Sequence, residues 1–181
     1  MLPLIIIGVV LLIVAGGLGV TSASSLVGGG SAPPPSNSDN VPAPFGSLGA
    51  NMITNDPSTW PSSDPIWMVC CAIASAEGAN IAGSNPDRLN NPGDISDGFK
   101  TYGGETHSGS NVTKFPNKET GWQWLYNKVQ NIQNGNSTVY SPDMTWIQIA
   151  QKWAGDWTSW VTNVSAFLGV DATSKFSDFT G

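Results

Sequence analysis

The chain has 181 residues, enough for one domain with appended segments but not for two domains of ordinary size. Charged side chains make up only 11% of it, and thirteen acidic against seven basic residues give a net charge of −6. Because proteins that bind nucleic acids need a basic face for the phosphate backbone, this balance argues against a nucleic-acid partner.

The first segment of the chain, residues 2–20, contains no charged side chain. As a helix it would extend about 28 Å, close to the hydrocarbon thickness of a bilayer. We therefore predict a transmembrane helix within residues 1–20, with a lipid membrane as its partner. A cleaved signal peptide is the alternative, because small residues follow at Thr21–Ala23, although no Lys or Arg precedes the apolar run. Since the first basic residue is Arg88, the charge asymmetry that sets membrane orientation cannot be read.

Residues 21–59 are dominated by Ser, Gly, Pro, Asn and Ala, with three consecutive prolines at 33–35. Such a composition buries too little apolar surface to offset the entropy that is lost on ordering. We predict a flexible linker here, followed by one domain over residues 60–181.

The remaining chain shows helical periodicity with one interruption. A helix is expected from Pro65, capped by Asp64 and ended by Gly78. Residues 79–116 are rich in Gly, Asn, Asp and Ser, which indicates loops with a small β-hairpin. Three further helices are expected to begin at a Thr and end at a Gly: Thr120–Gly135, Thr145–Gly155 and Thr158–Gly169. The predicted fold class is α+β, mainly α, with a small β-hairpin insertion.

The cysteines and tryptophans of the chain have few possible roles. Cys70 and Cys71 are adjacent, and neighbours on a helix point about 100° apart, so they are not expected to bond to each other. We interpret both as packing residues. The eight Trp are a high number for this length, so two interpretations are open for each: filling of the core or lining of a carbohydrate groove.

Glu77 falls on the apolar side of the first predicted helix. At about 100° per residue it lies close to Cys70 and Ile73, whereas Ser75 lies on the opposite side. Burial holds a carboxyl in its protonated form, and the C-terminus of a helix favours the same form. Such an acid can donate a proton to the leaving oxygen of a glycosidic bond. The alternatives are a side chain that turns to solvent or a structural ion pair with Arg88.

Two motifs near Glu77 resemble those of a known family. Residues 72–78 read Ala-Ile-Ala-Ser-Ala-Glu-Gly, and residues 88–95 read Arg-Leu-Asn-Asn-Pro-Gly-Asp-Ile. Together they resemble phage-encoded proteins of the lysozyme superfamily that are similar to soluble lytic transglycosylases. The resemblance continues through residues 115–121, 145–154 and 161–170, and it covers residues 60–175.

This resemblance implies a lysozyme-like fold and cleavage of the β-1,4 bond between N-acetylmuramic acid and N-acetylglucosamine in peptidoglycan. Glu77 matches the catalytic Glu of the family, and Asn90, Asn91 and Asp94 match a turn beside the substrate cleft. No cofactor is implied. The chain lacks the Ser after the Glu, the Gly-Leu-Met-Gln stretch and the Ala-Tyr-Asn-Ala-Gly motif of typical bacterial lytic transglycosylases. Hydrolysis and formation of an anhydro product therefore both stay open.

Three further side chains have alternative interpretations. Asp94 or Asp97 can be a second carboxylate that acts across a cleft, or an Asp that bonds to the backbone of its own turn. His107 is the only His and sits in a Gly/Ser/Thr loop without Cys or His partners, so we expect no metal site.

These features predict a membrane-anchored, peptidoglycan-cleaving enzyme whose partners are glycan strands and a lipid membrane. Because the family is phage-encoded, the expected location is the virion membrane of a phage, where the enzyme opens the cell wall during entry. The bacterial cell envelope is the alternative location. The alternative function is a structural virion or wall-binding protein with a lysozyme-like fold and no activity.

Membrane fractionation distinguishes the predicted anchor from a signal peptide. We expect the full-length protein to sediment with membranes, and a variant that begins near residue 55 to be soluble and folded, because the apolar run precedes the domain. N-terminal sequencing of the fractions completes the measurement. A soluble full-length protein that keeps its first residues would contradict the anchor, and a mature protein that begins near Ser24 would establish cleavage.

Overall fold

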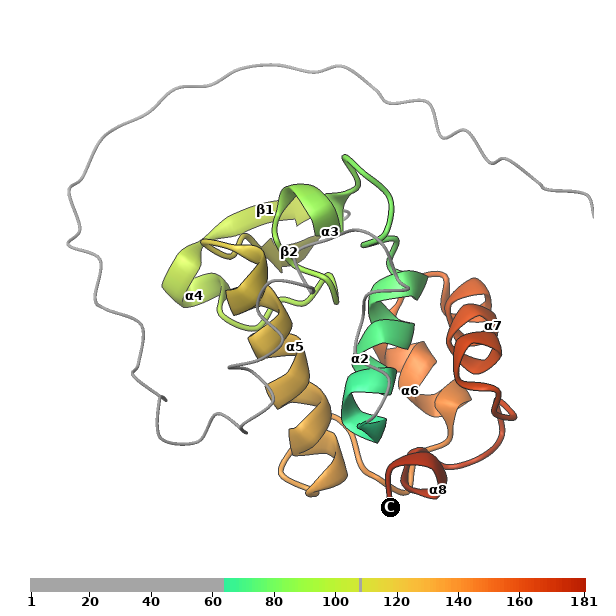
Figure 1. Ribbon diagram of the computed structural model, residues 1–181. Helices are drawn as coiled ribbons and strands as arrows, with labels where there is room; N and C mark the ends of the chain where they lie inside the picture. The colour runs from blue at the N-terminus through green and yellow to red at the C-terminus, as the bar shows by residue number, and fades with distance from the viewer. Residues whose placement is uncertain (1–63, 108) are drawn as a thin grey trace, which may run out of the picture. The chain divides into compact units, whose positions relative to one another are not determined.

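The computed structural model describes residues 64–107 and 109–181 (Figure 1). The predicted transmembrane helix in residues 1–20 and the predicted linker at 21–59 lie outside this part of the chain. No helix within it is long and apolar enough to cross a bilayer. Its elements are helices and one two-stranded antiparallel sheet, which confirms the α+β, mainly α class.

Helix α2 (Pro65–Ala76) has the ends that the sequence predicts. Asp64 caps it, and its Oδ1 accepts a hydrogen bond from the Ile66 N–H at 2.7 Å. Gly78 ends it with φ +82°, a left-handed conformation that glycine adopts without a steric penalty.

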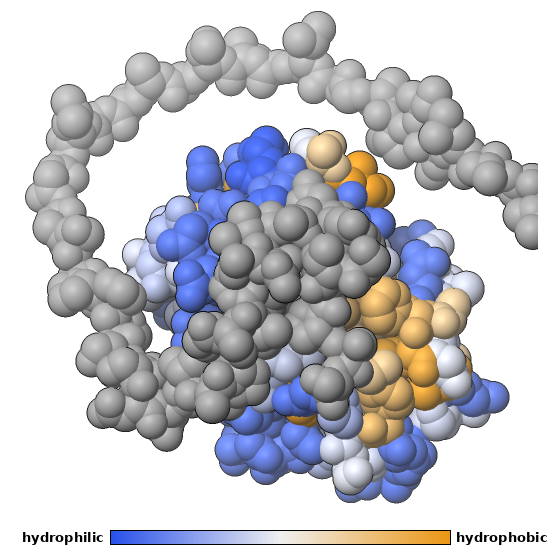
Figure 2. All heavy atoms as spheres, in the orientation of Figure 1, coloured by the Kyte–Doolittle hydropathy of each residue, from blue (hydrophilic) through white to orange (hydrophobic). Residues whose placement is uncertain are grey.

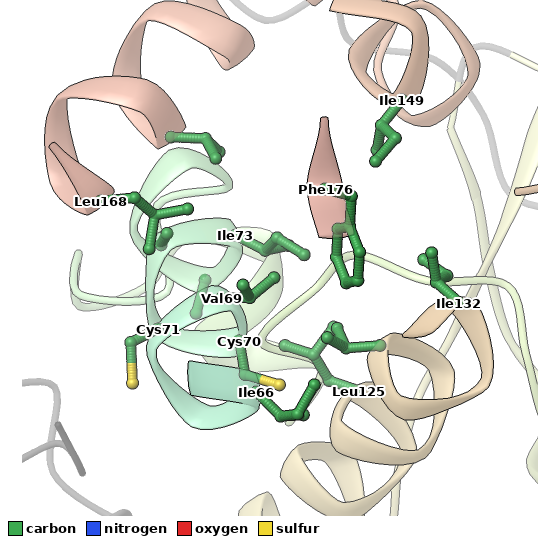
Figure 3. Close-up of a cluster of buried hydrophobic side chains, with 14 of the residues drawn as sticks. Ile66, Val69, Cys70, Cys71, Ile73, Leu125, Ile132, Ile149, Leu168 and Phe176 are labelled. Carbon is green, nitrogen blue, oxygen red and sulfur yellow. The ribbon is translucent and has the colours of Figure 1, made fainter. Parts of the chain in front are cut away.

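The core surrounds α2 rather than meeting it along one stripe. Residues 66, 67 and 69–74 are all buried, and α2 packs against α5 (Lys118–Gln133), α7 (Trp157–Leu168) and α8 (Phe176–Thr180). In Figure 3, Val69, Cys70 and Ile73 point toward α5 and Phe176, whereas Cys71 lies on the other side of α2. A helix that is apolar all round belongs inside a core. The sequence analysis assigned one apolar side to this helix, whereas the structure buries residues on several sides of it.

Cys70 and Cys71 are both buried in this core. Their sulfur atoms point to different sides of α2 (Figure 3), so the prediction that they pack rather than bond to each other is confirmed. Burial raises the pKa of the Cys70 thiol well above its usual range and that of the Cys71 thiol to about 12.

The later helices confirm some predicted ends and correct others. Helix α6 (Trp146–Trp153) is capped by Thr145, whose N–H donates in turn to the Gln148 side chain at 2.9 Å. Helix α7 ends at Gly169, which has φ +68°. These two ends were predicted from the cap residues alone, because a cap depends on partners within four positions.

The predicted starts of α5 and α7 are wrong by two residues or fewer. Asn117 caps α5 by accepting the Thr120 N–H at 2.8 Å, and Asp156 caps α7 ahead of Thr158. An Asn or Asp is at least as good a cap as Thr, so the earlier residue sets the start of each helix.

Helix α8 was not predicted. Its Phe176 is 1% exposed, and its ring centroid lies 5.4 Å from that of Trp146. The Phe176 N–H donates to the Met144 carbonyl at 2.9 Å, which ties the C-terminal segment to the start of α6.

The predicted hairpin region contains two strands, β1 (Gly104–His107) and β2 (Ser110–Thr113), which confirms the small β insertion. Two single-turn helices, α3 (Asn85–Arg88) and α4 (Phe99–Tyr102), lie in the same region. Figure 2 shows hydrophilic side chains over this end of the visible face, whereas apolar side chains gather beside α2 and α7.

Helix α5 rests directly on the turn that follows α3. A Cβ on Gly121 would lie 1.8 Å from the Asn90 carbonyl oxygen, so only glycine permits this approach. The contact fixes the turn at residues 90–95 against the helical part of the domain.

Gly121→Ala is expected to destabilise the fold by about 1–3 kcal/mol, because the clash outweighs the gain of up to about 1 kcal/mol in helix propensity. Gly155→Ala is the matched control, since a Cβ there meets no atom within 4 Å, and it is expected to change stability little. Urea denaturation of both variants measures the difference. Equal stability of the two would contradict the close contact.

Candidate active site

A pocket of about 880 Å³ lies where the end of α2, the turn at residues 94–96, the hairpin and the α6–α7 corner meet. Its wall brings together ionisable and aromatic side chains from segments that are far apart in the sequence. The ionisable residues are Glu77, Asp94, His107, Lys128, Lys152 and Asp156, and the aromatic ones are Tyr140, Trp153 and Trp160.

Glu77 is the residue that caps the C-terminus of α2, and its N–H donates to the Ile73 carbonyl at 2.9 Å. Its Oε1 accepts a hydrogen bond from the Trp160 indole N–H at 2.8 Å. Burial, reinforced by the negative charge of Asp94, raises the pKa of Glu77 to about 7, although the indole donors of Trp160 and Trp153 oppose the rise. A large fraction of Glu77 is therefore protonated near neutral pH.

Both structural alternatives for Glu77 are wrong. Arg88 does not pair with it, because its guanidinium binds Glu105, with Nη2 2.8 Å from Oε2. Glu77 does not turn to solvent either, because its carboxyl is held by Trp160 in the wall of the pocket.

Asp94 is a second carboxyl group in the same pocket. It has φ +48°, a left-handed conformation that is uncommon outside glycine, and its N–H donates to the Asn91 carbonyl at 3.0 Å. Its Oδ1 is buried and has no hydrogen-bond partner among the residues that the structure describes. Burial raises the pKa of Asp94, and the charge of His107 opposes this rise. The side chain therefore faces the pocket and does not bond to its own turn through Oδ1.

Three aromatic rings and a lysine form the helical side of the pocket. Trp153 and Trp160 are stacked, with ring centroids 5.8 Å apart and planes at 30°, and Tyr140 lies 5.6 Å from Trp153. The Lys128 ammonium lies over both Tyr140 and Trp153, 5.6 Å and 5.4 Å from the ring centroids. Trp160 is buried in the core and also lines the pocket, whereas Trp153 is only partly buried and lines the pocket.

Asn90 and Asn91, which the resemblance assigned to substrate binding, do not line the pocket. The Asn90 amide donates to the Phe115 carbonyl at 3.0 Å. Asn91 is fully buried; its amide donates to the carbonyls of Ile95 and Thr113 at 2.8 Å and 2.9 Å, and its Oδ1 accepts the Ile95 N–H. These bonds hold the turn that presents Asp94, and a role of the two asparagines in substrate binding stays a prediction.

Asp97, the other candidate for a second carboxylate, does not line the pocket. Its Oδ2 lies 2.6 Å from the Lys128 ammonium, so its charge is already balanced. The structure thus brings Asp94, and not Asp97, to Glu77.

His107 is a pocket residue that sequence reasoning missed. It ends β1, and its Nε2 lies 3.1 Å from Glu105 Oε2. A single His in a polar hairpin gives no signal in the sequence, because its position depends on how the hairpin folds over the pocket. Within residues 64–107 and 109–181, no group of three His, Cys, Asp or Glu side chains could hold a metal ion.

No family model, curated protein or solved structure matches this chain.

The raised pKa of Glu77 makes stability depend on pH. Its pKa is 4.5 ordinarily and about 7 in the fold, so the folded state binds this proton more tightly than the unfolded state does. The resulting stabilisation, up to about 3 kcal/mol, is fully present below the ordinary pKa and is lost as the pH rises through the folded-state value. Denaturant titrations at several pH values measure this loss.

In Glu77→Gln this contribution is absent, and stability is expected to fall less between pH 4.5 and 7 than in the parent. The amide oxygen can still accept the Trp160 N–H, so the fold is retained. Glu119→Gln is the control, because it makes the same change at an exposed position. If the unfolding free energy of both variants falls with pH as steeply as that of the parent protein, Glu77 is not buried in its protonated form.

Proposed function

We propose that this protein is a membrane-anchored enzyme with a lysozyme-like domain that cleaves the β-1,4 bond between N-acetylmuramic acid and N-acetylglucosamine. The observation that carries the proposal is the pairing of Glu77, with a pKa of about 7, and Asp94 in the wall of one pocket. Cleavage of glycosidic bonds commonly uses two carboxyl groups in different protonation states.

Glu77 is the general acid of the proposed reaction. It donates its proton to the oxygen that links the two sugars as the bond from that oxygen to the anomeric carbon breaks. The positive charge that develops on the sugar is stabilised by the ionised Asp94.

Asp94 favours hydrolysis over formation of an anhydro product. Its carboxylate accepts a proton from a water molecule whose oxygen bonds to the anomeric carbon, so the products together contain one added water. The enzyme returns to its starting state when the proton passes from Asp94 to Glu77 through solvent.

The aromatic side of the pocket supports a carbohydrate substrate. Trp153 and Tyr140 present flat apolar surfaces beside polar and charged groups, and such combinations are typical of small-molecule sites. A pocket of about 880 Å³ has room for sugar rings.

The proposed location is the virion membrane of a phage, with the bacterial cell envelope as the alternative. It rests on the uncharged run at residues 2–20 and on the resemblance to a phage-encoded family. A linker of this length gives the domain room to reach glycan strands while the chain stays at the membrane.

Digestion of purified peptidoglycan by the full-length protein in detergent tests the proposal. Glu77→Gln is expected to lower the rate by about 10²–10⁴ while circular dichroism shows an intact fold, because the general acid is lost. Asp143→Asn is the control, since this exposed carboxylate pairs with Lys175 outside the pocket.

Mass analysis of the released fragments separates the two reaction outcomes. The hydrolysis product is heavier than the anhydro product by one water. An active protein that releases anhydro sugars would leave Glu77 as the acid but remove the role of Asp94. A folded parent that binds peptidoglycan without cleaving it would favour the wall-binding alternative.

A further inference from the structure

The β-hairpin carries a chain of charged contacts that ends at the pocket. The Arg88 guanidinium of α3 binds both carboxylate oxygens of Glu105, and Glu105 Oε2 lies 3.1 Å from the His107 ring. Glu105 and His107 are two positions apart on β1, so both side chains project from the same face of the hairpin. Of these three residues, only His107 lines the pocket.

Burial raises the pKa of both carboxyl groups in the pocket, so Asp94 needs a further group to stay ionised in acid. Each negative charge disfavours the other, and burial disfavours both. A cation that acts on Asp94 stabilises its charged form. His107 lines the same pocket as both carboxyl groups; its charge opposes the rise of the Asp94 pKa, whereas the charge that acts on Glu77 is that of Asp94.

We propose that His107 is a positioning residue for the charge of the pocket: the hairpin presents its imidazolium to Asp94 and keeps that carboxyl ionised in acid, while Glu77 stays protonated. This inference rests on the proposed function, in which Asp94 works as the ionised partner.

Glu105 holds the imidazole in place. Its hydrogen bonds with Arg88 lower its pKa to about 2, so it remains ionised wherever the pocket can work. The Arg88 guanidinium in turn binds Glu105 and does not line the pocket.

A histidine suits this task better than a lysine. Histidine side chains change charge between about pH 5 and 8. A histidine in general carries its positive charge in acid, where a neighbouring carboxylate would otherwise be protonated.

Few other charges face His107 and Asp94. Strand β2 contributes none, because its four residues are Ser, Asn, Val and Thr. On the helical side Lys128 is paired with Asp97, with Nζ 2.6 Å from Oδ2. The remaining charged groups in the pocket wall are Glu77 at the end of α2, and Lys152 and Asp156 at the α6–α7 corner.

The direct test is an NMR titration of the Asp94 carboxyl carbon in the full-length protein in detergent micelles. The signal is assigned by its loss in Asp94→Asn. In His107→Gln, which removes the charge, the midpoint of the Asp94 titration is expected to move to higher pH. In His107→Lys, which makes the charge permanent, the midpoint is expected to stay at or below that of the parent.

Lys114→Gln is the matched control, because it removes one exposed positive charge just after β2 that does not line the pocket. It is expected to leave the Asp94 midpoint unchanged. The proposal is overturned if His107→Gln leaves the midpoint in place, or if Lys114→Gln moves it equally, since the effect would then be one of net charge.

The pH profile of peptidoglycan cleavage gives a second readout. The acid limb is expected to move to higher pH in His107→Gln but not in His107→Lys, with a several-fold loss of rate only on that limb. A loss by the same factor at every pH would reduce His107 to a structural residue and overturn the proposal. A parent that cleaves nothing defeats the proposed function, whereas the titration still decides whether His107 controls Asp94.

Discussion

Helix α2 runs through the core, and its end delivers a carboxyl group to the wall of the pocket. A charged carboxylate at that position loses hydration that protein groups only partly replace. The Trp160 indole replaces part of it with one hydrogen bond, yet the pKa of Glu77 still rises to about 7. Burial and the neighbouring Asp94 therefore outweigh the indole donors, and the protonated form becomes accessible near neutral pH.

Packing contacts around the pocket hold Asp94 and Trp160 close to Glu77. The turn before Asp94 is held by the buried Asn91 amide, and Gly121 lets α5 pack against the Asn90 carbonyl. Trp160 is itself fixed by burial and by its stack on Trp153. Each contact limits where the two carboxyl groups can lie, so the geometry of the pocket depends on core packing as much as on the residues that face it.

The parts of the fold that could be predicted are those encoded locally. Asp64, Gly78 and Thr145 set helix ends through partners within four positions, and each behaves as its residue type predicts. The hairpin followed from composition alone. Helix α8 could not be predicted, because five residues carry too little periodicity and its burial depends on Trp146, thirty positions earlier.

The same difference between local and long-range contacts explains how much of the site could be predicted. The helical wheel identified Glu77, but it could not reveal Trp160, whose indole is 83 positions away in the sequence. The Asn-Asn-Pro-Gly-Asp motif predicted a turn near Glu77. Which of its side chains faces the pocket depends on long-range bonds such as that between Asn91 and Thr113, so the sequence could not show that Asp94 lines the pocket and the two asparagines do not. His107 gave no signal for the same reason.

The two buried thiols of α2 react poorly with oxidants. Oxidation of cysteine and exchange with disulfides proceed through the thiolate, and the raised pKa values of Cys70 and Cys71 leave very little of it. Neither sulfur is presented to a reagent at the surface, and the two point apart. Within the described residues the cysteines of α2 thus present no reactive thiol, and thiol oxidation is not expected to alter this helix.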